Sequence, residues 1–346
     1  MSKTRFVLPL AVIAVVISLT VAAVVLAKVN QSGSQNNLRS VLGSVDRPDM
    51  SGDEHAGHGG DKGPTEPVIV QAAPNRSDVS FFRAQLSGDE EVQEEGGPAA
   101  GDDNGSATAW LRVTGKEVTF ALSWKGIQAP SAAHIHLGEA GQNGDVKVPL
   151  FASKLPNGVK AVTGTLQADG EVADQLVNNP DGFYANVHTA EFPGGAVRGQ
   201  LEPLDKPFDF NSVLRGGPLT SLNDGKQEIA PADGKAAGDP DGNATALARA
   251  WGECVAYSFT WSGIQPPTVG HIHKGTAGNN GDPVVPLFEA GANGLPRTIT
   301  GMAGQIEGVD RAVVDRINAN PSNYYTNLHT GEFPGGAVRG QLFRAG

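Results

Sequence analysis

The chain has 346 residues, enough for two domains of ordinary size and additional segments. Its formal net charge of −11 disfavours a nucleic-acid partner, because phosphate binding needs a cationic surface. A single cysteine, Cys254, excludes an intrachain disulfide framework and a two-cysteine metal site, and 46 glycines against 4 tryptophans favour short strands over long helices.

The N-terminal segment, residues 1–29, differs in kind from the rest. Lys3 and Arg5 precede an uncharged apolar run of 22 residues, Phe6 to Ala27. As a helix this run would rise about 33 Å, enough to cross a hydrocarbon core about 30 Å thick. We therefore expect a single-pass transmembrane helix, with a cleaved signal as the alternative because Val25-Leu26-Ala27 offers small residues for cleavage. Either outcome places the rest of the chain outside the cytoplasm, at the cell membrane or secreted.

Residues 30–78 are polar and rich in Gly, Ser, Asp and Pro, without apolar periodicity. Such a composition buries too little apolar surface to offset its ordering entropy, so we expect a disordered linker. Within it, His55 and His58 lie among carboxylates and could collect a divalent metal weakly. We favour the alternative that this stretch is a solvated linker.

The remainder of the chain is an internal duplication. Equivalent residues are 137 apart in the earlier part of each unit and 141 apart after a four-residue insertion, as in Trp124/Trp261, His134/His271, Asp145/Asp282, His188/His329, Phe192/Phe333 and Arg198/Arg339. A unit of about 120 residues is the size of a domain rather than of a solenoid repeat. We place the two domains at 79–203 and 214–344, joined by a proline-containing linker.

Most segments of each unit are predicted to be strands. Val118, Phe120, Leu122 and Trp124 alternate with smaller or polar residues, which indicates a strand with one buried face. The strands expected in the first unit are 80–86, 106–113, 117–124, 133–137, 161–167, 184–188 and 196–201. The apolar neighbours of Cys254 predict a buried core thiol.

One segment of each unit follows a helical period instead. Val309, Val313 and Ile317 recur every four residues and precede Pro321, which predicts a short amphipathic helix. Its counterpart runs from Glu171 to Asn178. Each domain is therefore expected to be all-β with one short helix.

Six of the eight histidines occupy matching places in the two units. They are His134, His136 and His188 in the first unit and His271, His273 and His329 in the second. In a strand, residues i and i+2 point to the same face, so each His-x-His pair projects together, and the third histidine can join it from another strand. Three imidazoles suit copper or zinc and leave a coordination position open. The alternative is that these histidines are structural and hydrogen-bond the backbone of the long turn that follows.

Other repeated polar residues lie near these histidines. Asp145 and Asp282 are candidates for a fourth ligand or for a residue that orients a histidine, although their loops are also composed like ordinary turns. Arg198 and Arg339 are expected to form internal ion pairs with carboxylates such as Glu191 and Glu332, with substrate binding as the alternative.

An acidic cluster precedes a strand in both units, at 102–105 and 239–243. It contains part of a calcium-loop pattern but lacks the bidentate glutamate, so we predict ordinary turns.

Three motifs carry a resemblance to a known family. They are Ala133-His134-Ile135-His136-Leu137-Gly138, Asn186-Val187-His188-Thr189 and Phe192-Pro193-Gly194-Gly195-Ala196-Val197-Arg198-Gly199-Gln200-Leu201. Each unit resembles the CHRD domain, named for the animal protein chordin and also found in bacterial secreted or membrane proteins, over about 250 of the 346 residues. The resemblance implies an extracellular immunoglobulin-like or related β-sandwich. Chordin's cysteine-rich modules are missing, so its growth-factor ligand is not carried over. A His-x-His pair in a β-sandwich is also similar to copper/zinc superoxide dismutase, whose disulfide cysteines and full histidine set are missing.

The sequence thus predicts an all-β chain of two tandem immunoglobulin-like or superoxide-dismutase-like β-sandwich domains after an N-terminal transmembrane helix. No Ser-His-Asp order, Walker loop, G-x-S-x-G or paired-carboxylate signature is visible, which disfavours an enzyme. We expect a membrane-tethered binding, adhesion or scaffold module with an extracytoplasmic protein or matrix partner. The alternative is a copper-handling or superoxide-reactive metalloprotein.

Overall fold

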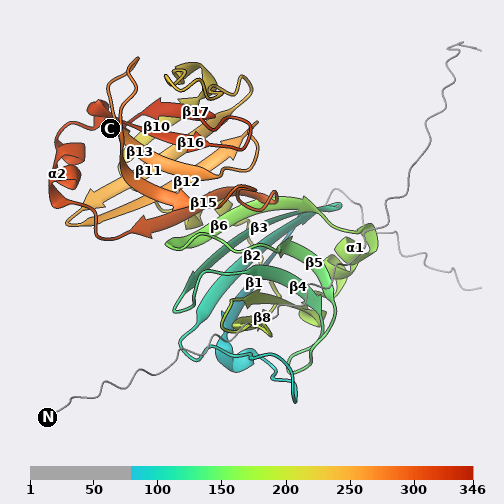
Figure 1. Cartoon of the computed structure of the whole chain (residues 1–346). Helices are drawn as coiled ribbons and strands as arrows, with labels where there is room; N and C mark the ends of the chain where they lie inside the picture. The colour runs from blue at the N-terminus through green and yellow to red at the C-terminus, as the bar shows by residue number, and fades with distance from the viewer. Residues whose placement is uncertain (1–78, 346) are drawn as a thin grey trace, which may run out of the picture. The chain divides into compact units, whose positions relative to one another are not determined.

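The computed structural model describes residues 79–345 (Figure 1). The expected transmembrane helix at 1–29 and linker at 30–78 lie outside the described residues. Within the described part, no helix has both the length and the apolar character needed to span a membrane. The described chain is all-β, with antiparallel strands that belong to one hydrogen-bonded sheet, two α-helices and short 3-10 turns. The 3-10 turns are η1 (Gly88–Glu90), η2 (Pro180–Gly182), η3 (Phe210–Val213), η4 (Gly225–Gln227) and η5 (Pro321–Asn323).

The first repeat supplies nine strands. They are β1 (Val79–Ser87), β2 (Ser106–Thr114), β3 (Glu117–Lys125), β4 (Ala132–Leu137), β5 (Val146–Phe151), β6 (Val159–Gln167), β7 (Phe183–His188), β8 (Val197–Gln200) and β9 (Glu202–Pro203). Their pairing order is β5-β4-β7-β8-β1-β2-β3-β6, with β9 also alongside β1. The two sheets expected of a sandwich are therefore continuous through the short contact between β8 and β1.

The second repeat follows the same plan. Its strands are β10 (Leu219–Asp224), β11 (Asn243–Trp251), β12 (Cys254–Ser262), β13 (Val269–Lys274), β14 (Pro283–Glu289), β15 (Ile299–Ile306), β16 (Tyr324–His329), β17 (Val338–Gln341) and β18 (Phe343–Arg344). They pair in the order β14-β13-β16-β17-β10-β11-β12-β15, with β18 beside β10. The predicted duplication thus extends to the strand order.

Strand β6 of the first repeat pairs antiparallel with β15 of the second (Figure 1). Val162 and Met302 face one another at the centre of this pairing. They are equivalent positions, because Val162 also lies opposite Leu122 of β3 while Met302 lies opposite Phe259, the counterpart of Leu122, in β12. The two repeats therefore meet through the same strand in a pseudo-twofold arrangement.

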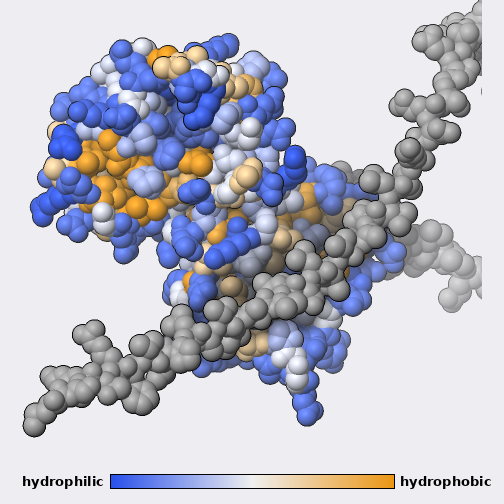
Figure 2. All heavy atoms as spheres, viewed as in Figure 1, coloured by the Kyte–Doolittle hydropathy of each residue, from blue (hydrophilic) through white to orange (hydrophobic). Residues whose placement is uncertain are grey.

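The core follows the alternation that the sequence predicts. In β2 every second residue is buried, and in β3 Val118, Phe120, Leu122 and Trp124 are all at most 6% exposed. Full burial of such side chains contributes roughly 1.5–3 kcal/mol each. The surface in Figure 2 is correspondingly mostly hydrophilic, with an apolar patch on the second repeat.

The two predicted helices are present. Helix α1 (Gly170–Asn178) begins after Asp169, whose side chain accepts a hydrogen bond from the Glu171 amide, and it ends before Pro180. Helix α2 (Arg311–Ala319) begins after Asp310 in the same way, two residues later than the periodicity indicates. Each helix buries its apolar stripe against its own repeat.

Two features differ from the sequence predictions. Strands β5 and β14 are not among the predicted strands, and each carries an internal proline, Pro149 and Pro286. Both pair on one side only among the described residues, with β4 and β13, and an edge position tolerates proline. Cys254 is half-buried rather than in the core, since it begins β12 beside an exposed turn.

Candidate metal sites

Each histidine cluster lies on the polar face of the sheet formed by β4, β7 and β8, or by β13, β16 and β17. Ala133 and Ile135 of β4 enter the core, at 1% and 0% exposure, so His134 and His136 project from the opposite face. On the neighbouring strand β7, His188 lies opposite Ala132, two positions from the residue that faces His134. Strand pairing thus brings a histidine 54 residues away beside the His-x-His pair, as predicted.

The ring nitrogens converge at distances that suit a metal ion. His134 Nδ1 lies 3.3 Å from His188 Nε2, and His271 Nδ1 lies 3.3 Å from His329 Nε2. Two nitrogens bound tetrahedrally to one ion at about 2.0–2.1 Å would be about 3.3–3.4 Å apart. One ligand atom from each of the three histidines lies within 4.8 Å of the others in both repeats, so each triad could hold a metal ion.

Backbone carbonyls orient the rings with their lone pairs toward the centre. His136 Nδ1 donates to Gly144 O at 2.9 Å, and His188 Nδ1 donates to Pro193 O at 3.1 Å. Because a carbonyl only accepts, each of these rings carries its proton on Nδ1 and keeps Nε2 unprotonated. His136 Nε2 is buried without a hydrogen-bond partner, as is its counterpart His273 Nε2. A buried unpartnered lone pair is costly unless something such as a cation binds it.

The environment keeps the histidines neutral, the form that binds metal. Burial, with smaller contributions from the neighbouring imidazoles, lowers the pKa of His134 to about 4, and the same causes lower the pKa of His271 to about 4. Burial also lowers the pKa values of the other four histidines of the triads. At neutral pH all six are therefore uncharged.

A stack of three side chains supports the central histidine. The His136 ring lies on the Tyr184 ring with centroids 4.8 Å apart, and the Arg198 guanidinium covers the Tyr184 ring at 3.5 Å. Arg198 also donates to Glu139 O and Gln142 O, and so holds the loop whose Gly144 carbonyl orients His136.

This arrangement corrects one prediction and explains one motif. The expected ion pair between Arg198 and Glu191 is wrong, because Arg198 contacts loop carbonyls and Glu191 instead accepts a hydrogen bond from Gln128. The ion pair expected for Arg339 and Glu332 fails for the same reason.

The side chain of Gln200 donates to Gly138 O and Asp181 O. The Arg-Gly-Gln sequence thus clamps the loop that follows the His-x-His pair.

The acidic residues beside the clusters are not ligands in this structure. The Asp145 side chain is 87% exposed and pairs with Lys147 at 3.5 Å, and Asp282 is also exposed. This exposure agrees with the turn interpretation of their loops and not with the alternative of a fourth ligand or an orienting partner, and Gly144 O and Gly281 O orient the rings instead. The acidic cluster of each repeat forms a turn as predicted, with Asp102 accepting from the Asn104 amide.

A carboxyl group near each cluster was missed. Glu91 Oε2 accepts a hydrogen bond from Asn186 Nδ2 at 3.1 Å, and Asn186 lies opposite His134 on the next strand. Burial raises the pKa of Glu91 to about 7 against the lowering effects of Asn186 and Arg198. In the second repeat Glu228 Oε1 accepts from Asn327 Nδ2 at 2.7 Å, and burial raises its pKa to about 8. Their shared spacing of 137 residues was the available signal.

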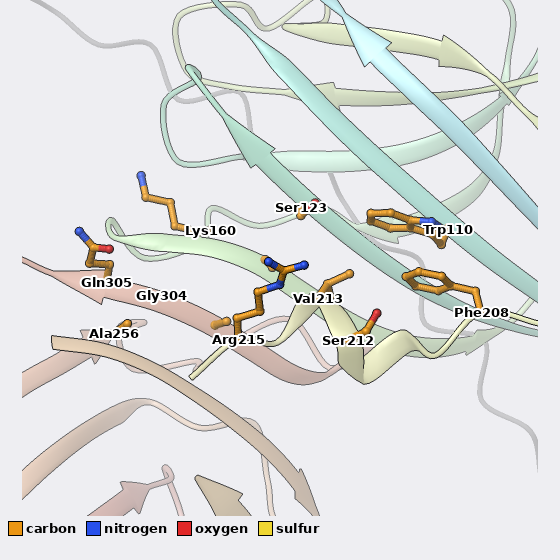
Figure 3. Close-up of a pocket in the computed structure, with 12 residues that line it drawn as sticks. Trp110, Ser123, Lys160, Phe208, Ser212, Val213, Arg215, Ala256, Gly304 and Gln305 are labelled. Carbon is orange, nitrogen blue, oxygen red and sulfur yellow. The ribbon is translucent and has the colours of Figure 1, made fainter. Parts of the chain in front are cut away.

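A separate pocket of about 420 Å³ lies beside the β6–β15 pairing. In Figure 3 the Trp110 and Phe208 rings lie face to face at one end, with Arg215 and Val213 beside them. None of the triad histidines lines this pocket, so it belongs to the packing of the inter-repeat linker rather than to the clusters.

The fold and the repeated clusters can now be set against known proteins. The CHRD domain family model matches the chain twice, at residues 82–201 and 219–342. The chain therefore belongs to the CHRD domain family and carries two such domains in tandem, which confirms the resemblance drawn from the sequence. Comparisons with curated proteins and with solved structures give no significant match.

Proposed function

We propose that this chain is a membrane-tethered extracytoplasmic binding module whose two CHRD domains each hold one copper or zinc ion. The observation that carries the proposal is the same in both domains. Three neutral imidazoles converge within 4.8 Å, and one of them has a buried nitrogen without a partner. The facing nitrogens of His134 and His188 share a hydrogen bond, as do those of His271 and His329, so the Nε2 atoms of His136 and His273 are the buried triad atoms that have no partner.

The donor set selects the kind of metal. Imidazole nitrogen suits copper and zinc, whereas calcium and magnesium prefer oxygen ligands. Both metal-capable groups found among residues 79–345 consist of histidine alone. The bound ion would leave one position for a further ligand, since three protein ligands complete neither a tetrahedral nor a square arrangement.

The cellular setting rests on the sequence. The uncharged run from Phe6 to Ala27 supports an N-terminal anchor, and Lys3 and Arg5 support a cytoplasmic N-terminus. The proposed partner is an extracytoplasmic protein or matrix component. Full-length protein with a C-terminal tag should resist extraction from membranes by alkali, and the tag should be accessible to protease added from outside the cell. Recovery of the protein in the cytosolic fraction would contradict this setting.

Metal analysis tests the central part of the proposal. Full-length protein purified without a nickel column, loaded with copper or zinc and then desalted, should retain about two equivalents. The His136→Ala/His273→Ala double variant should retain none while keeping its circular dichroism spectrum. A His55→Ala/His58→Ala variant, altered only in the N-terminal segment, is the matched control and should still retain two. Equal retention in all three proteins would overturn the assignment.

A second candidate function is a copper-handling or superoxide-reactive metalloprotein. It is favoured by the unequal burial of the ligands, because His134 and His188 are only partly buried whereas His136 is 9% exposed. The site therefore has a side that solutes can approach. Superoxide consumption by the copper-loaded protein at a rate above that of free copper would support this function, and a rate no higher would exclude it.

A further inference from the structure

A cavity of about 180 Å³ adjoins the first histidine triad. It is bounded on one side by the sheet and on the other by the loop that follows β1. The lining residues used below are His136, Tyr184 and Asn186 from the sheet, and Val92, Glu94 and Ala100 from the loop. Since a water molecule takes about 30 Å³ of liquid, the space has room for several water molecules or for one small solute.

Two buried side chains present unpartnered polar atoms at this cavity. His136 Nε2 and Asn186 Oδ1 have no hydrogen-bond partner, although the two residues are only 9% and 4% exposed. The orientation of the Asn186 amide is fixed, because its Nδ2 donates to the Glu91 carboxyl group. Its Oδ1 is therefore the atom left over. Unpartnered buried atoms that line a cavity indicate a missing ligand.

Most donors nearby are already used. Asn143 Nδ2 donates to Val92 O and Glu94 Oε1, and the Gly144 amide donates to Tyr184 Oη. The hydroxyl hydrogen of Tyr184 remains as a donor and Asn186 Oδ1 as an acceptor, since the proposed ion takes the His136 lone pair. Such a lining suits a small molecule that can both donate and accept hydrogen bonds.

We propose that this cavity is a ligand chamber of the first metal site, and that it delivers a small neutral hydrogen-bond donor, of the size of water or hydrogen peroxide, to the open position on the ion. The inference rests on the proposed metal site. Asn186 Oδ1 accepts a hydrogen bond from the bound molecule and so orients it beside the ion.

The test uses full-length protein in which His271→Ala/His273→Ala has silenced the second site. This protein is loaded with one equivalent of Cu(II), and water on the copper is counted by pulsed electron paramagnetic resonance in D₂O. The parent should show one coordinated water. Ala100→Leu, which fills the chamber, should bind copper equally and lose at least half of the deuterium signal. Val92→Phe fills the same space from another position and serves if the first variant does not fold.

The matched control is Ala237→Leu, the equivalent substitution in the second repeat, which should leave the deuterium signal unchanged. A full deuterium signal in both chamber-filling variants with copper still bound would overturn the proposal that this cavity supplies the molecule bound to the ion. So would the absence of coordinated water in the parent. Failure of the parent to bind copper at all would instead overturn the proposed metal site, so the two failures are distinguishable.

Discussion

The ring of His136 lies parallel to the ring of Tyr184, with centroids 4.8 Å apart and an interplanar angle of 13°. His273 and Tyr325 repeat this contact at 4.8 Å and 11°. In both domains a tyrosine thus fixes the plane of the one triad histidine that has a buried unpartnered nitrogen. Through Tyr184 the stack connects Arg198, which holds the loop after β4, to His136, the candidate metal ligand.

Removing this tyrosine should weaken metal binding without abolishing it. Tyr184→Leu is expected to lower the affinity of the first site about 10- to 100-fold, the usual cost of losing a residue that orients a ligand. Tyr184→Phe should lower it less, because the stack remains while the hydrogen bond with the Gly144 amide is lost. Competition with a chelator measures the affinity in protein whose second site has been silenced. Tyr325→Leu in the same background is the control, and an equal loss there would contradict a local role.

The hydrogen bonds from Arg198 to the loop after β4 should contribute to the free energy of unfolding. Arg198 is 1% exposed, and its guanidinium donates to Glu139 O, Gln142 O and Asn143 Oδ1. Arg198→Lys cannot reproduce this set of contacts, and we expect it to lower the free energy of unfolding by about 2–4 kcal/mol in urea titrations. Arg83→Lys, at an exposed pair with Glu202, should change it by no more than about 0.5 kcal/mol. Similar effects of the two substitutions would argue against the clamp.

Much of this architecture could be predicted from the sequence. The period-2 pattern in β3 and the 137-residue spacing of Trp124 and Trp261 were sufficient for the strands and the duplication. The histidines of each repeat could be grouped because residues i and i+2 of a strand share a face and a neighbouring strand can bring a third residue beside them. The edge strands β5 and β14 were missed because their prolines suit an edge, and position in the sheet is not visible locally.

The partners of the charged residues could not be predicted. The sequence offers Arg198 a nearby carboxylate, Glu191, yet Arg198 contacts carbonyls of a loop 56 to 59 residues away. Every residue has a backbone carbonyl, so the sequence does not show which carbonyls accept a hydrogen bond from Arg198. Asp145 is a candidate ligand from its position alone, but its side chain is exposed and Gly144 O orients the His136 ring.

The metal-free protein should lose stability in mild acid. The folded pKa of His134 and of His271 is lowered from 6.5 to about 4. Between these values the unfolded chain takes up protons that the folded chain does not, so the free energy of unfolding falls as the pH drops from 6.5 towards 4. Glu91 and Glu228 oppose this trend, so the measurement belongs in a Glu91→Gln/Glu228→Gln background. A stability that is flat across this range would contradict the buried, neutral triads.

The buried carboxyl groups of Glu91 and Glu228 should lower the free energy of unfolding as the pH rises. Burial raises the folded pKa of Glu228 from 4.5 to about 8, so its contribution to stability is complete below 4.5 and is lost as the pH rises to about 8. Glu228→Gln mimics the protonated form and should gain in stability relative to the parent protein as the pH rises from 5 to 9. Thermal melting at several pH values measures this difference. Glu332→Gln, at an exposed glutamate of the same repeat, should show no such trend.

X-ray absorption spectroscopy of full-length protein loaded with two equivalents of zinc tests the central claim most directly. Three convergent imidazoles in each domain predict a shell with three imidazole nitrogens at about 2.0–2.1 Å and one further light ligand. A shell dominated by oxygen, or zinc that is lost on desalting, would contradict the metal sites and leave the two histidine triads with a structural role.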